Sequence, residues 1–272
     1  MTLLAYLASL LIGLALGLLG GGGSILTLPV LVYLFGVSAV EATAYSLFIV
    51  GATALASIIP KARAGEIDFK TALWFGLPSI AAVYFTRSVV MPAIPDPIWS
   101  AGSFALGKGT ALMLLFAILM VWASISMIKG PQSKNQNSAK PGLSPVAKTA
   151  LVLAEGLGVG VLTGLVGAGG GFLIVPALVL VAGLEMKVAV GTSLTIIAFK
   201  SLIGFTGDLD HLDANWTLLL SVTAIAIVGM VFGAALSKRI ASSQLQKAFG
   251  WFVLTMGVLI LTERIFTLNL IP

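Results

Sequence analysis

Apolar runs of 17 or more residues recur along the whole of this 272-residue chain. A helical run of that length can cross the roughly 30 Å hydrocarbon layer of a membrane. Composition agrees, because 58% of the residues are hydrophobic and only 9% are charged, whereas about a quarter of the residues in soluble domains are charged. The sequence therefore predicts an all-α polytopic membrane protein. Its first apolar run lacks the features of a cleaved signal peptide and is expected to be a membrane helix.

Hydropathy predicts ten apolar helices, at 3–19, 25–35, 42–59, 70–90, 103–128, 148–166, 172–182, 188–206, 215–236 and 246–262. A polar segment from Lys129 to Lys148 separates the first five from the last five and is too rich in Pro, Ser and Asn to lie in lipid. We expect an N-terminal membrane repeat over 1–128, a polar cytoplasmic linker over 129–148 and a C-terminal membrane repeat over 149–272.

The two halves are copies of each other. Adding 147 to the residue number aligns 13–57 with 160–204 without a gap and gives 16 identities in 45 positions. Several identities are Gly or Pro, which match by chance less easily than apolar residues do. Beyond this block we expect the register to shift by two, so that Asp68 aligns with Asp213. Duplicated halves are a common plan of secondary transporters.

The distribution of basic residues predicts that the repeats are inverted. If each half crosses the membrane an odd number of times, ten basic residues share one side: Lys61, Arg63, Lys70, Lys129, Lys134, Lys140, Lys148, Lys238, Arg239 and Lys247. The other side keeps Arg87, Arg264 and the acidic segment 207–215. An even count reduces the asymmetry to about eight against four. The odd count places the linker in the cytoplasm and both termini outside, and makes each half a Gly-broken helical hairpin followed by three spans.

Each half also carries a cluster of glycines inside an apolar run. The segments are "GLLGGGGSILTLP" at 17–29 and "GLVGAGGGFLIVP" at 164–176. A continuous helix over 3–35 would be roughly 50 Å long, more than a membrane needs, and each interior Gly weakens a helix by about 1 kcal/mol. Non-helical backbone at membrane depth must be buried in protein or line an aqueous cavity. Paired breaks of this kind indicate the binding site of a transporter.

A half-helix that begins near Ser24 or Gly171 presents unpaired N–H donors and the positive end of its dipole. Such a site favours an anion with several acceptor oxygens, such as sulfite, sulfonate, sulfate or carboxylate. The alternative is that the glycines only allow close helix packing, but a repeated run followed by Pro favours the broken helix. The candidate substrate-binding residues here are Gly20, Gly21, Gly22, Gly23, Ser24, Gly167, Gly169, Gly170 and Gly171.

Polar side chains within the expected spans extend this candidate site. Tyr45 and Ser46 align with Thr192 and Ser193, so both halves are expected to supply hydroxyls to one centre. Lys200 lies in mid-span, where a cation is costly unless it is paired or faces a cavity. It is therefore a candidate for substrate binding, although it could instead extend its charge toward the acidic segment 207–213. Lys108, near a span end, is expected to extend its charge to the membrane surface.

The acidic residues supply candidates for ion coupling. Glu155 has no counterpart in the first half and is expected either to pair locally or to carry a proton. Asp208 and Asp210 belong with His211 and Asp213 to the one acidic cluster, for which a solvated loop is the favoured interpretation. We recognise no metal-ligand spacing and no enzyme motif. The chain has no cysteine, and its basic residues form no cluster typical of nucleic-acid binding.

A known family shares the duplicated motifs. The chain resembles the sulfite exporter TauE/SafE family, also called the toluene sulfonate uptake permease family, in "GLLGGGGSILTLPVL" and in "EGLGVGVLTGLVGAGGGFLIVPALVLVAGLEMKVAVGTSL" followed by "KSLIGFTGDLD". The resemblance implies a multi-span transporter of sulfur-containing or carboxylated organic anions, commonly an exporter and coupled to an ion gradient. The family's glycine motifs match Gly20 to Ser24 and Gly167 to Gly171, and its "GTS" signature matches 191–193. The first half departs from the pattern in its long Thr86–Trp99 connection and in Tyr45.

Together these features predict a secondary transporter of small anions in the cell inner membrane, with sulfur-containing oxyanions or organosulfonates of the sulfite or sulfoacetate type as substrates. The expected partners are this small anion, membrane lipids and a coupling ion, H⁺ or Na⁺, with no cofactor, metal or nucleic acid. Two alternatives stay open. One is an anion channel that uses the same breaks as its pore, and the other is a membrane scaffold or accessory subunit that transports nothing.

Overall fold

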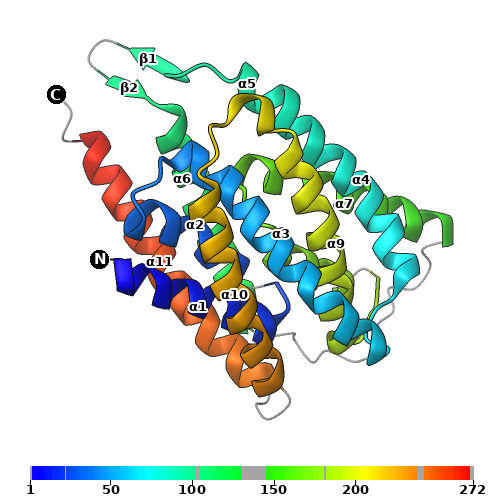
Figure 1. The fold of residues 1–272 in the computed structure, drawn as a ribbon. Helices are drawn as coiled ribbons and strands as arrows, with labels where there is room; N and C mark the ends of the chain where they lie inside the picture. Colours follow the sequence, from blue (N-terminus) through cyan, green and yellow to red (C-terminus); the bar gives the residue numbers. More distant parts are fainter. Residues whose placement is uncertain are drawn as a thin grey trace.

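The structure is a computed structural model that describes residues 2–21, 23–101, 104–129, 145–180, 182–237 and 242–269. The expected site residue Gly22, most of the expected linker and the basic residues Lys238 and Arg239 lie outside the described residues. Figure 1 shows the chain as a bundle of helices with a small β-hairpin at one end.

The elements of the two halves follow the same order. The first half contains α1 (Thr2–Leu19), α2 (Ser24–Pro29), the π-helix η1 (Val30–Leu34), α3 (Ala39–Arg63), α4 (Phe69–Phe85), the π-helix η2 (Thr86–Val90), α5 (Met91–Ala93), β1 (Trp99–Ala101), β2 (Phe104–Leu106) and α6 (Lys108–Lys129). The second half contains α7 (Pro145–Val166), α8 (Gly171–Leu180), α9 (Met186–Thr206), the 3₁₀-helix η3 (Leu209–His211), α10 (Trp216–Leu236) and α11 (Ser242–Asn269). Each predicted apolar segment therefore has its helix.

Within the described residues, six helices are long and apolar enough to cross a membrane: Ala39–Arg63, Phe69–Ala93, Lys108–Ile125, Thr149–Val166, Met186–His211 and Trp216–Leu236. This confirms the predicted all-α polytopic membrane protein. The expected long connection after Thr86 is largely ordered, because the helical path of α4 continues through η2 and α5 to Ala93. The antiparallel pair β1–β2 follows it and is a small exception to the all-α prediction.

Helices at equivalent places in the two halves make equivalent contacts. α1 packs along α10 and α7 packs along α4, while α3 packs on α9 and α6 on α11. Because α1 corresponds to α7 and α4 to α10, exchanging the halves leaves this pattern unchanged. Glycines permit the close approach: Gly13 contacts the carbonyl of Ala226, and Gly160 contacts that of Ser79, so tightly that neither position has room for a side chain. Both contacts are related by the same offset of 147 that relates the two halves.

That offset continues into α4 and α10, so the expected two-residue shift was wrong. Asp68 is the N-cap of α4 and accepts a hydrogen bond from the N–H of Thr71, while Asn215 is the N-cap of α10 and accepts one from the N–H of Leu218. The two caps differ by 147 in number. Asp and Asn cap helices about equally well, and the structural counterpart of Asp68 is therefore Asn215 rather than Asp213.

The equivalent helices α3 and α9 run in opposite directions. Tyr45, near the start of α3, bonds to Asn215 beyond the end of α9, and Thr192, near the start of α9, bonds to Asp68 beyond the end of α3. Antiparallel packing of equivalent helices is the arrangement that inverted repeats require. The orientation of the halves across a membrane stays a prediction.

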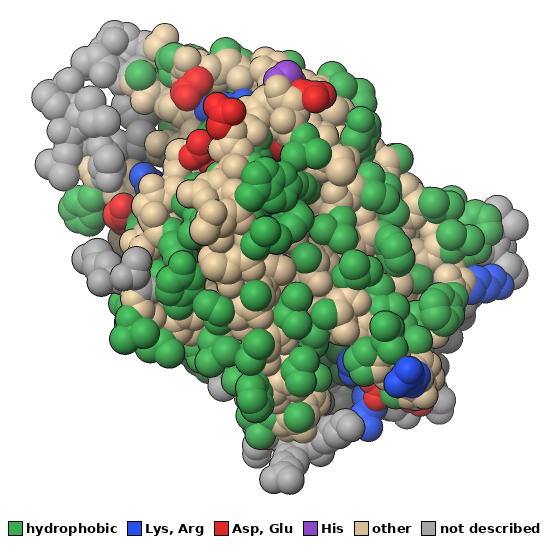
Figure 2. All heavy atoms as spheres, in the orientation of Figure 1, with side chains coloured by type: hydrophobic (Ala, Val, Ile, Leu, Met, Phe, Trp, Pro, Cys, Tyr) green, Lys and Arg blue, Asp and Glu red, His purple; other side chains and the backbone are tan. Residues whose placement is uncertain are grey.

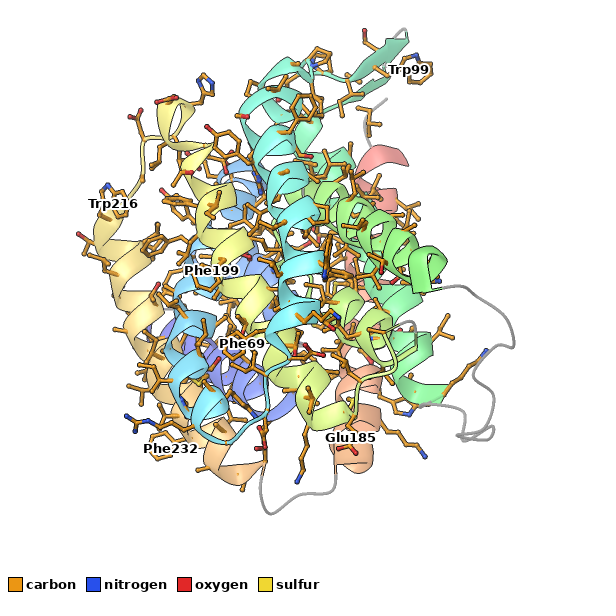
Figure 3. The ribbon with its side chains drawn as sticks, turned by 90° about the vertical axis from the view of Figure 1, so that its right-hand side faces the viewer. Phe69, Trp99, Glu185, Phe199, Trp216 and Phe232 are labelled. Carbon is orange, nitrogen blue, oxygen red and sulfur yellow. The ribbon has the colours of Figure 1, made fainter. Side chains whose placement is uncertain are left out.

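The two ends of the bundle differ in charge. One end carries the acidic α9–α10 connection with His211, and the other carries the basic residues around the α3–α4 connection. In Figure 2 the Asp, Glu and His side chains gather at the upper end, while most of the visible Lys and Arg side chains lie toward the lower end. Between the ends the surface is apolar. Phe199 and Phe232 are 48% and 62% exposed, and in Figure 3 Phe199 lies between Trp99 at one end and Glu185 at the other, whereas Phe232 lies near the level of Glu185.

Candidate functional site

Both predicted helix breaks are present. α1 ends at Leu19 and α2 begins at Ser24, while α7 ends at Val166 and α8 begins at Gly171. The chain reverses between them through left-handed backbone, with φ of +63° and +128° at Gly20 and Gly21 and of +72°, +62° and +77° at Gly167, Gly169 and Gly170. Residues other than Gly rarely adopt these backbone angles. The glycines are therefore needed for the reversal itself.

The two breaks meet inside the bundle. A Cβ atom placed on Gly21 would lie 2.8 Å from the Cα of Gly171, and one placed on Gly171 would lie 2.5 Å from the carbonyl carbon of Gly21. A Cβ on Gly169 would lie 3.2 Å from the Cβ of Ser24. Backbone from each half thus touches backbone from the other, and side chains at these positions would hold the halves apart.

Among the residues that the structure describes, the start of α8 has backbone N–H groups without a backbone acceptor near this contact. The N–H groups of Leu173 and Ile174 donate to the carbonyl of Gly170, at 3.0 and 2.9 Å. The N–H groups of Gly171 and Phe172 come before these first helical hydrogen bonds, as is usual at a helix N-terminus. The start of α2 is more fully bonded, because both the N–H and the hydroxyl of Ser24 donate to the carbonyl of Gly21. The second break thus has more backbone N–H groups available to donate hydrogen bonds to an anion than the first break has.

Lys200 places a positive charge at the second break. The residue is fully buried, and its Nζ donates to the Thr163 hydroxyl at 2.8 Å. A Cβ on Gly170 would lie 2.8 Å from the same Nζ. The ion pairs Lys61–Glu66 and Arg87–Asp208 do not include Lys200, which has no carboxylate partner among the described residues. Its charge therefore lies beside the glycine break rather than near the acidic segment 207–213.

Ser193 and Ser46, the equivalent serines, are both buried but differ in bonding. The Ser193 hydroxyl donates to the carbonyl of Gly20 at 2.7 Å and to that of Val190 at 2.9 Å. The Ser46 hydroxyl has no hydrogen-bond partner among the residues that the structure describes. Ser193 thus holds the first break against α9.

Tyr45 and Thr192 do not share one centre, contrary to the expectation. The Tyr45 hydroxyl accepts a hydrogen bond from the N–H of Asn215 at 2.8 Å, and the Thr192 hydroxyl accepts one from the N–H of Asp68 at 2.9 Å. These bonds lie at opposite ends of the α3–α9 pair. Each joins a hydroxyl of one half to the N-cap of a helix in the other half, so the pair acts as two equivalent clasps between the repeats.

A second polar region lies at the acidic end of the bundle. Arg87, which the sequence reasoning counted only among the residues of that side, is 1% exposed. Its Nη1 donates to the Thr43 hydroxyl at 2.9 Å and lies 3.4 Å from Asp208 Oδ2. A cavity of about 290 Å³ adjoins it. Lys108 also lines this cavity, and its Nζ donates to the carbonyl of Met91 instead of extending freely.

The remaining acidic candidates are dispersed. Asp210, His211 and Asp213 are exposed, as expected for a solvated loop, whereas the Asp208 side chain is only 13% exposed. Glu155 is half-buried on α7, and its Oε2 has no partner among the described residues. The part of the chain that the structure describes holds no group of three His, Cys, Asp or Glu side chains that could bind a metal.

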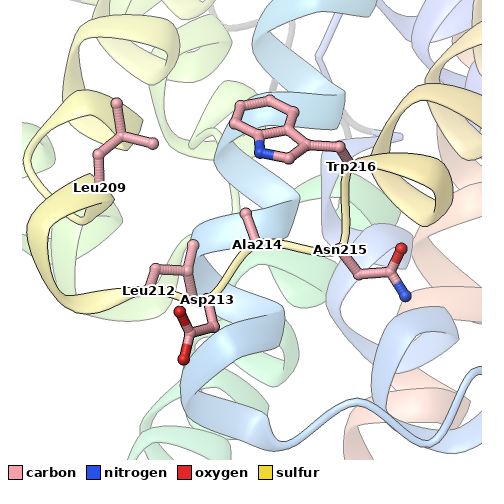
Figure 4. Close-up of a pocket in the computed structure, with 6 residues that line it drawn as sticks. All are labelled: Leu209, Leu212, Asp213, Ala214, Asn215 and Trp216. Atoms are coloured by element: carbon pink, nitrogen blue, oxygen red, sulfur yellow. The ribbon is translucent and has the colours of Figure 1, made fainter.

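A hollow of about 440 Å³ lies on the α9–α10 connection and is lined by Leu209, Leu212, Asp213, Ala214, Asn215 and Trp216. Figure 4 shows Leu209 and Trp216 on one side of this connection, with the carboxylate of Asp213 on the other. The lining of this hollow contains no cationic side chain. We therefore assign the candidate anion site to the glycine breaks and not to this hollow.

Comparison with known proteins identifies the family. The family model of the sulfite exporter TauE/SafE matches residues 5–260. The chain belongs to this family. A "Probable membrane transporter protein" of Xylella fastidiosa is 31% identical over 258 residues, which cover 92% of this chain and 91% of that protein. The "Probable membrane transporter protein YunE" of Bacillus subtilis is 27% identical over 261 residues, which cover 92% and 93% of the two chains. No solved structure matches the chain.

Membership of this family agrees with the six span-capable helices, and the chain is a multi-pass membrane protein rather than an enzyme. The motif that carries the resemblance, Gly167 to Gly171, is also the segment that forms the second break. The sequence thus predicted the two breaks, which the structure contains, and Lys200, predicted as a candidate binding residue, lies beside the second break. The sequence assigned no such role to the buried Arg87. The available signal was an Arg within an otherwise apolar run, because a charge in such a run requires a partner.

Proposed function

We propose that this protein is a secondary transporter of small anions in the cell inner membrane. Its substrates would be sulfur-containing oxyanions or organosulfonates of the sulfite or sulfoacetate type, and its transport would be coupled to an H⁺ or Na⁺ gradient. The family membership and the names of its relatives support the transporter class. The geometry of the two breaks supports the preference for an anion.

One observation carries the proposal: the glycine breaks of the two halves meet beside the buried ammonium of Lys200. A lysine ammonium has three N–H donors, and Thr163 accepts one of them. A buried charge with a single neutral partner is costly, so an anion that binds there recovers part of this cost. The free N–H groups at the start of α8 and its dipole add to the attraction.

The proposed central site therefore consists of the backbone at Gly20, Gly21 and Gly167 to Gly171 together with Lys200 and Thr163. Ser193 positions the first break, whereas Tyr45 and Thr192 are assigned to the clasps between the halves. In this conformation the breaks touch, so an anion must separate Gly21 from Gly171 to enter between them. Such a separation would occur if one repeat moves against the other, and two inverted repeats would expose the site to each side in turn.

Flux measurements in proteoliposomes test the proposal. The purified full-length chain should carry sulfite, sulfoacetate or a related small sulfonate with saturable kinetics, and an imposed H⁺ or Na⁺ gradient should change the rate. Glu155→Gln should alter the dependence on this gradient if Glu155 takes part in coupling. Liposomes that show no saturable flux of these anions would rule the proposal out and leave the scaffold alternative.

A further inference from the structure

Arg87 is buried at the acidic end of the bundle, away from the glycine breaks. Both of its hydrogen bonds use the same nitrogen, since Nη1 donates to the Thr43 hydroxyl at 2.9 Å and to Asp208 Oδ1 at 3.5 Å. The Nε and Nη2 atoms have no acceptor among the residues that the structure describes. Asp208 therefore contacts one nitrogen of the guanidinium and leaves the other two without a partner.

The two unpartnered nitrogens form one edge of the planar guanidinium. Their N–H bonds point in nearly the same direction, and this fork matches the spacing of two oxygens in a carboxylate, sulfite or sulfonate. Buried donors without an acceptor are costly, more so when they carry charge. The free edge of Arg87 is thus suited to an anion with two acceptor oxygens, and a monodentate contact with Asp208 does not occupy it.

The cavity next to Arg87 can admit such an anion. Its volume is about 290 Å³, and its lining includes Lys108, Asp208 and His211. This volume exceeds what a single water molecule requires by about twentyfold. The lining also contains the carboxylates of Glu41 and Asp213, and neither of these residues is buried, whereas Arg87 is. Water screens their charge more strongly than that of a buried group.

Arg87 also contacts the second break through Thr43. The Thr43 hydroxyl accepts the hydrogen bond from Arg87, and its carbonyl packs directly against Gly167. Thr43 therefore links Arg87, which lines the cavity, to the second break of the proposed central site. Position 234, which is equivalent to Arg87 in the second half, is Ala. The other end of the bundle thus has no equivalent arginine.

We propose that the Nε–Nη2 edge of Arg87 binds a small anion with two acceptor oxygens before it reaches the central site, and that Asp208 holds Arg87 when no anion is bound. This inference rests on the proposed function and adds a recognition site at one entrance only. An arriving anion competes with Asp208 for the guanidinium, so Asp208 lowers the affinity of this site. Thr43 and Asp208 are positioning residues in this account.

The test measures the binding of sulfite to the purified full-length protein by calorimetry. A Lys200→Met background removes the cation of the central site, so that the remaining sulfite binding reports on the entrance. In that background Arg87→Lys should weaken sulfite binding by about tenfold, because Lys lacks the two-donor edge. Asp208→Asn should tighten it roughly fivefold, because the competing carboxylate is lost. The matched control Glu66→Gln removes the carboxylate of the Lys61–Glu66 ion pair at the other end of the bundle and should leave sulfite affinity unchanged.

Several outcomes would overturn this inference. One is sulfite affinity that is the same in Arg87→Lys, Asp208→Asn and Glu66→Gln, and another is weaker binding in Asp208→Asn. A Lys200→Met protein that binds no sulfite at all also excludes the second site. The same calorimetry can be repeated with sodium salts and with choline salts. If sodium binds and this binding depends on Asp208, while sulfite binding does not, the cavity is a cation site. Saturable flux in wild-type proteoliposomes alongside any of these results would leave the proposed function intact.

Discussion

Lys200 combines a structural cost with a proposed function. Its ammonium is fully buried and bonds to the Thr163 hydroxyl. We expect Lys200→Met to raise the free energy of unfolding by about 1–4 kcal/mol, because a buried charge is replaced by an apolar side chain of similar length, and to abolish anion binding at the central site while leaving the sulfite binding at the Arg87 entrance. Chemical denaturation and calorimetry measure the two effects.

The matched control for Lys200→Met is Lys187→Met, which removes an exposed lysine from the same helix. The free energy of unfolding of Lys187→Met should stay within about 0.5 kcal/mol of the wild-type value. If Lys200→Met destabilised the protein and left anion affinity unchanged, Lys200 would be a structural residue and not a binding one.

Gly171 tests the contact between the two breaks. A Cβ atom there meets the backbone of Gly21, which has no flexible side chain to move aside. Gly171→Ala should therefore destabilise the protein by about 1–3 kcal/mol and reduce anion flux. Gly158→Ala is the control, since a Cβ at that position on α7 has nothing within 4 Å. Equal flux and equal stability in the two variants would mean that the breaks are not in contact.

At the level of single residues, the sequence identified charged side chains whose burial is costly and whose neighbours in the chain are apolar. Lys200 was a candidate because an apolar run surrounds it. Arg87 was missed because it lies near the end of an expected span, where a cation ordinarily reaches water. Its partner Asp208 is 121 residues away, and only the folded chain brings the two together. Tyr45 and Thr192 were misplaced for a similar reason, since equivalent residues of antiparallel helices lie at opposite ends.

At the scale of helices, the clasps at Tyr45 and Thr192 join the two repeats. Tyr45→Phe and Thr192→Val should each lower the free energy of unfolding by about 1 kcal/mol, because a backbone N–H loses its acceptor. The two losses should add within about 0.5 kcal/mol, because the clasps are far apart. Denaturation of the single and double variants measures this.

Tyr84→Phe and Thr255→Val are suitable controls for the clasps, because both side chains are exposed and the Thr255 hydroxyl donates to the carbonyl of Trp251 within its own helix. Neither clasp variant should change anion affinity. A large loss of affinity in either would return Tyr45 or Thr192 to the binding site.

The helical elements could be predicted because their signals are local. Length and hydropathy define the spans, and the Gly runs with Pro29 and Pro176 define the breaks. The register of α10 could not be predicted in this way. Asp213 matches Asp68 in residue type, but Asn215 matches it in the capping geometry, and an alignment by identity favours the wrong partner. The β1–β2 hairpin was missed because its strands have only three residues each.

At the scale of the whole molecule, the antiparallel α3 and α9 predict which ends face opposite sides of the membrane. The chain has no cysteine, so single cysteines can be introduced directly. Asp210→Cys, at the acidic end, should react with an impermeant maleimide in intact cells. Ala64→Cys, at the basic end, should react only after the cells are permeabilised, since basic loops favour the cytoplasm. Labelling of both positions from one side would contradict the inverted topology.

Two glycine breaks and Lys200 are proposed to form an alternating anion site, and solute counterflow in proteoliposomes can show whether they do. Vesicles loaded with unlabelled sulfite should transiently concentrate labelled sulfite when they contain the wild-type chain, because a carrier exchanges one anion for another. Vesicles with Lys200→Met should not, although we expect that variant to be folded. Passive equilibration without transient accumulation would indicate a channel, and undiminished counterflow in Lys200→Met would contradict the account of the site.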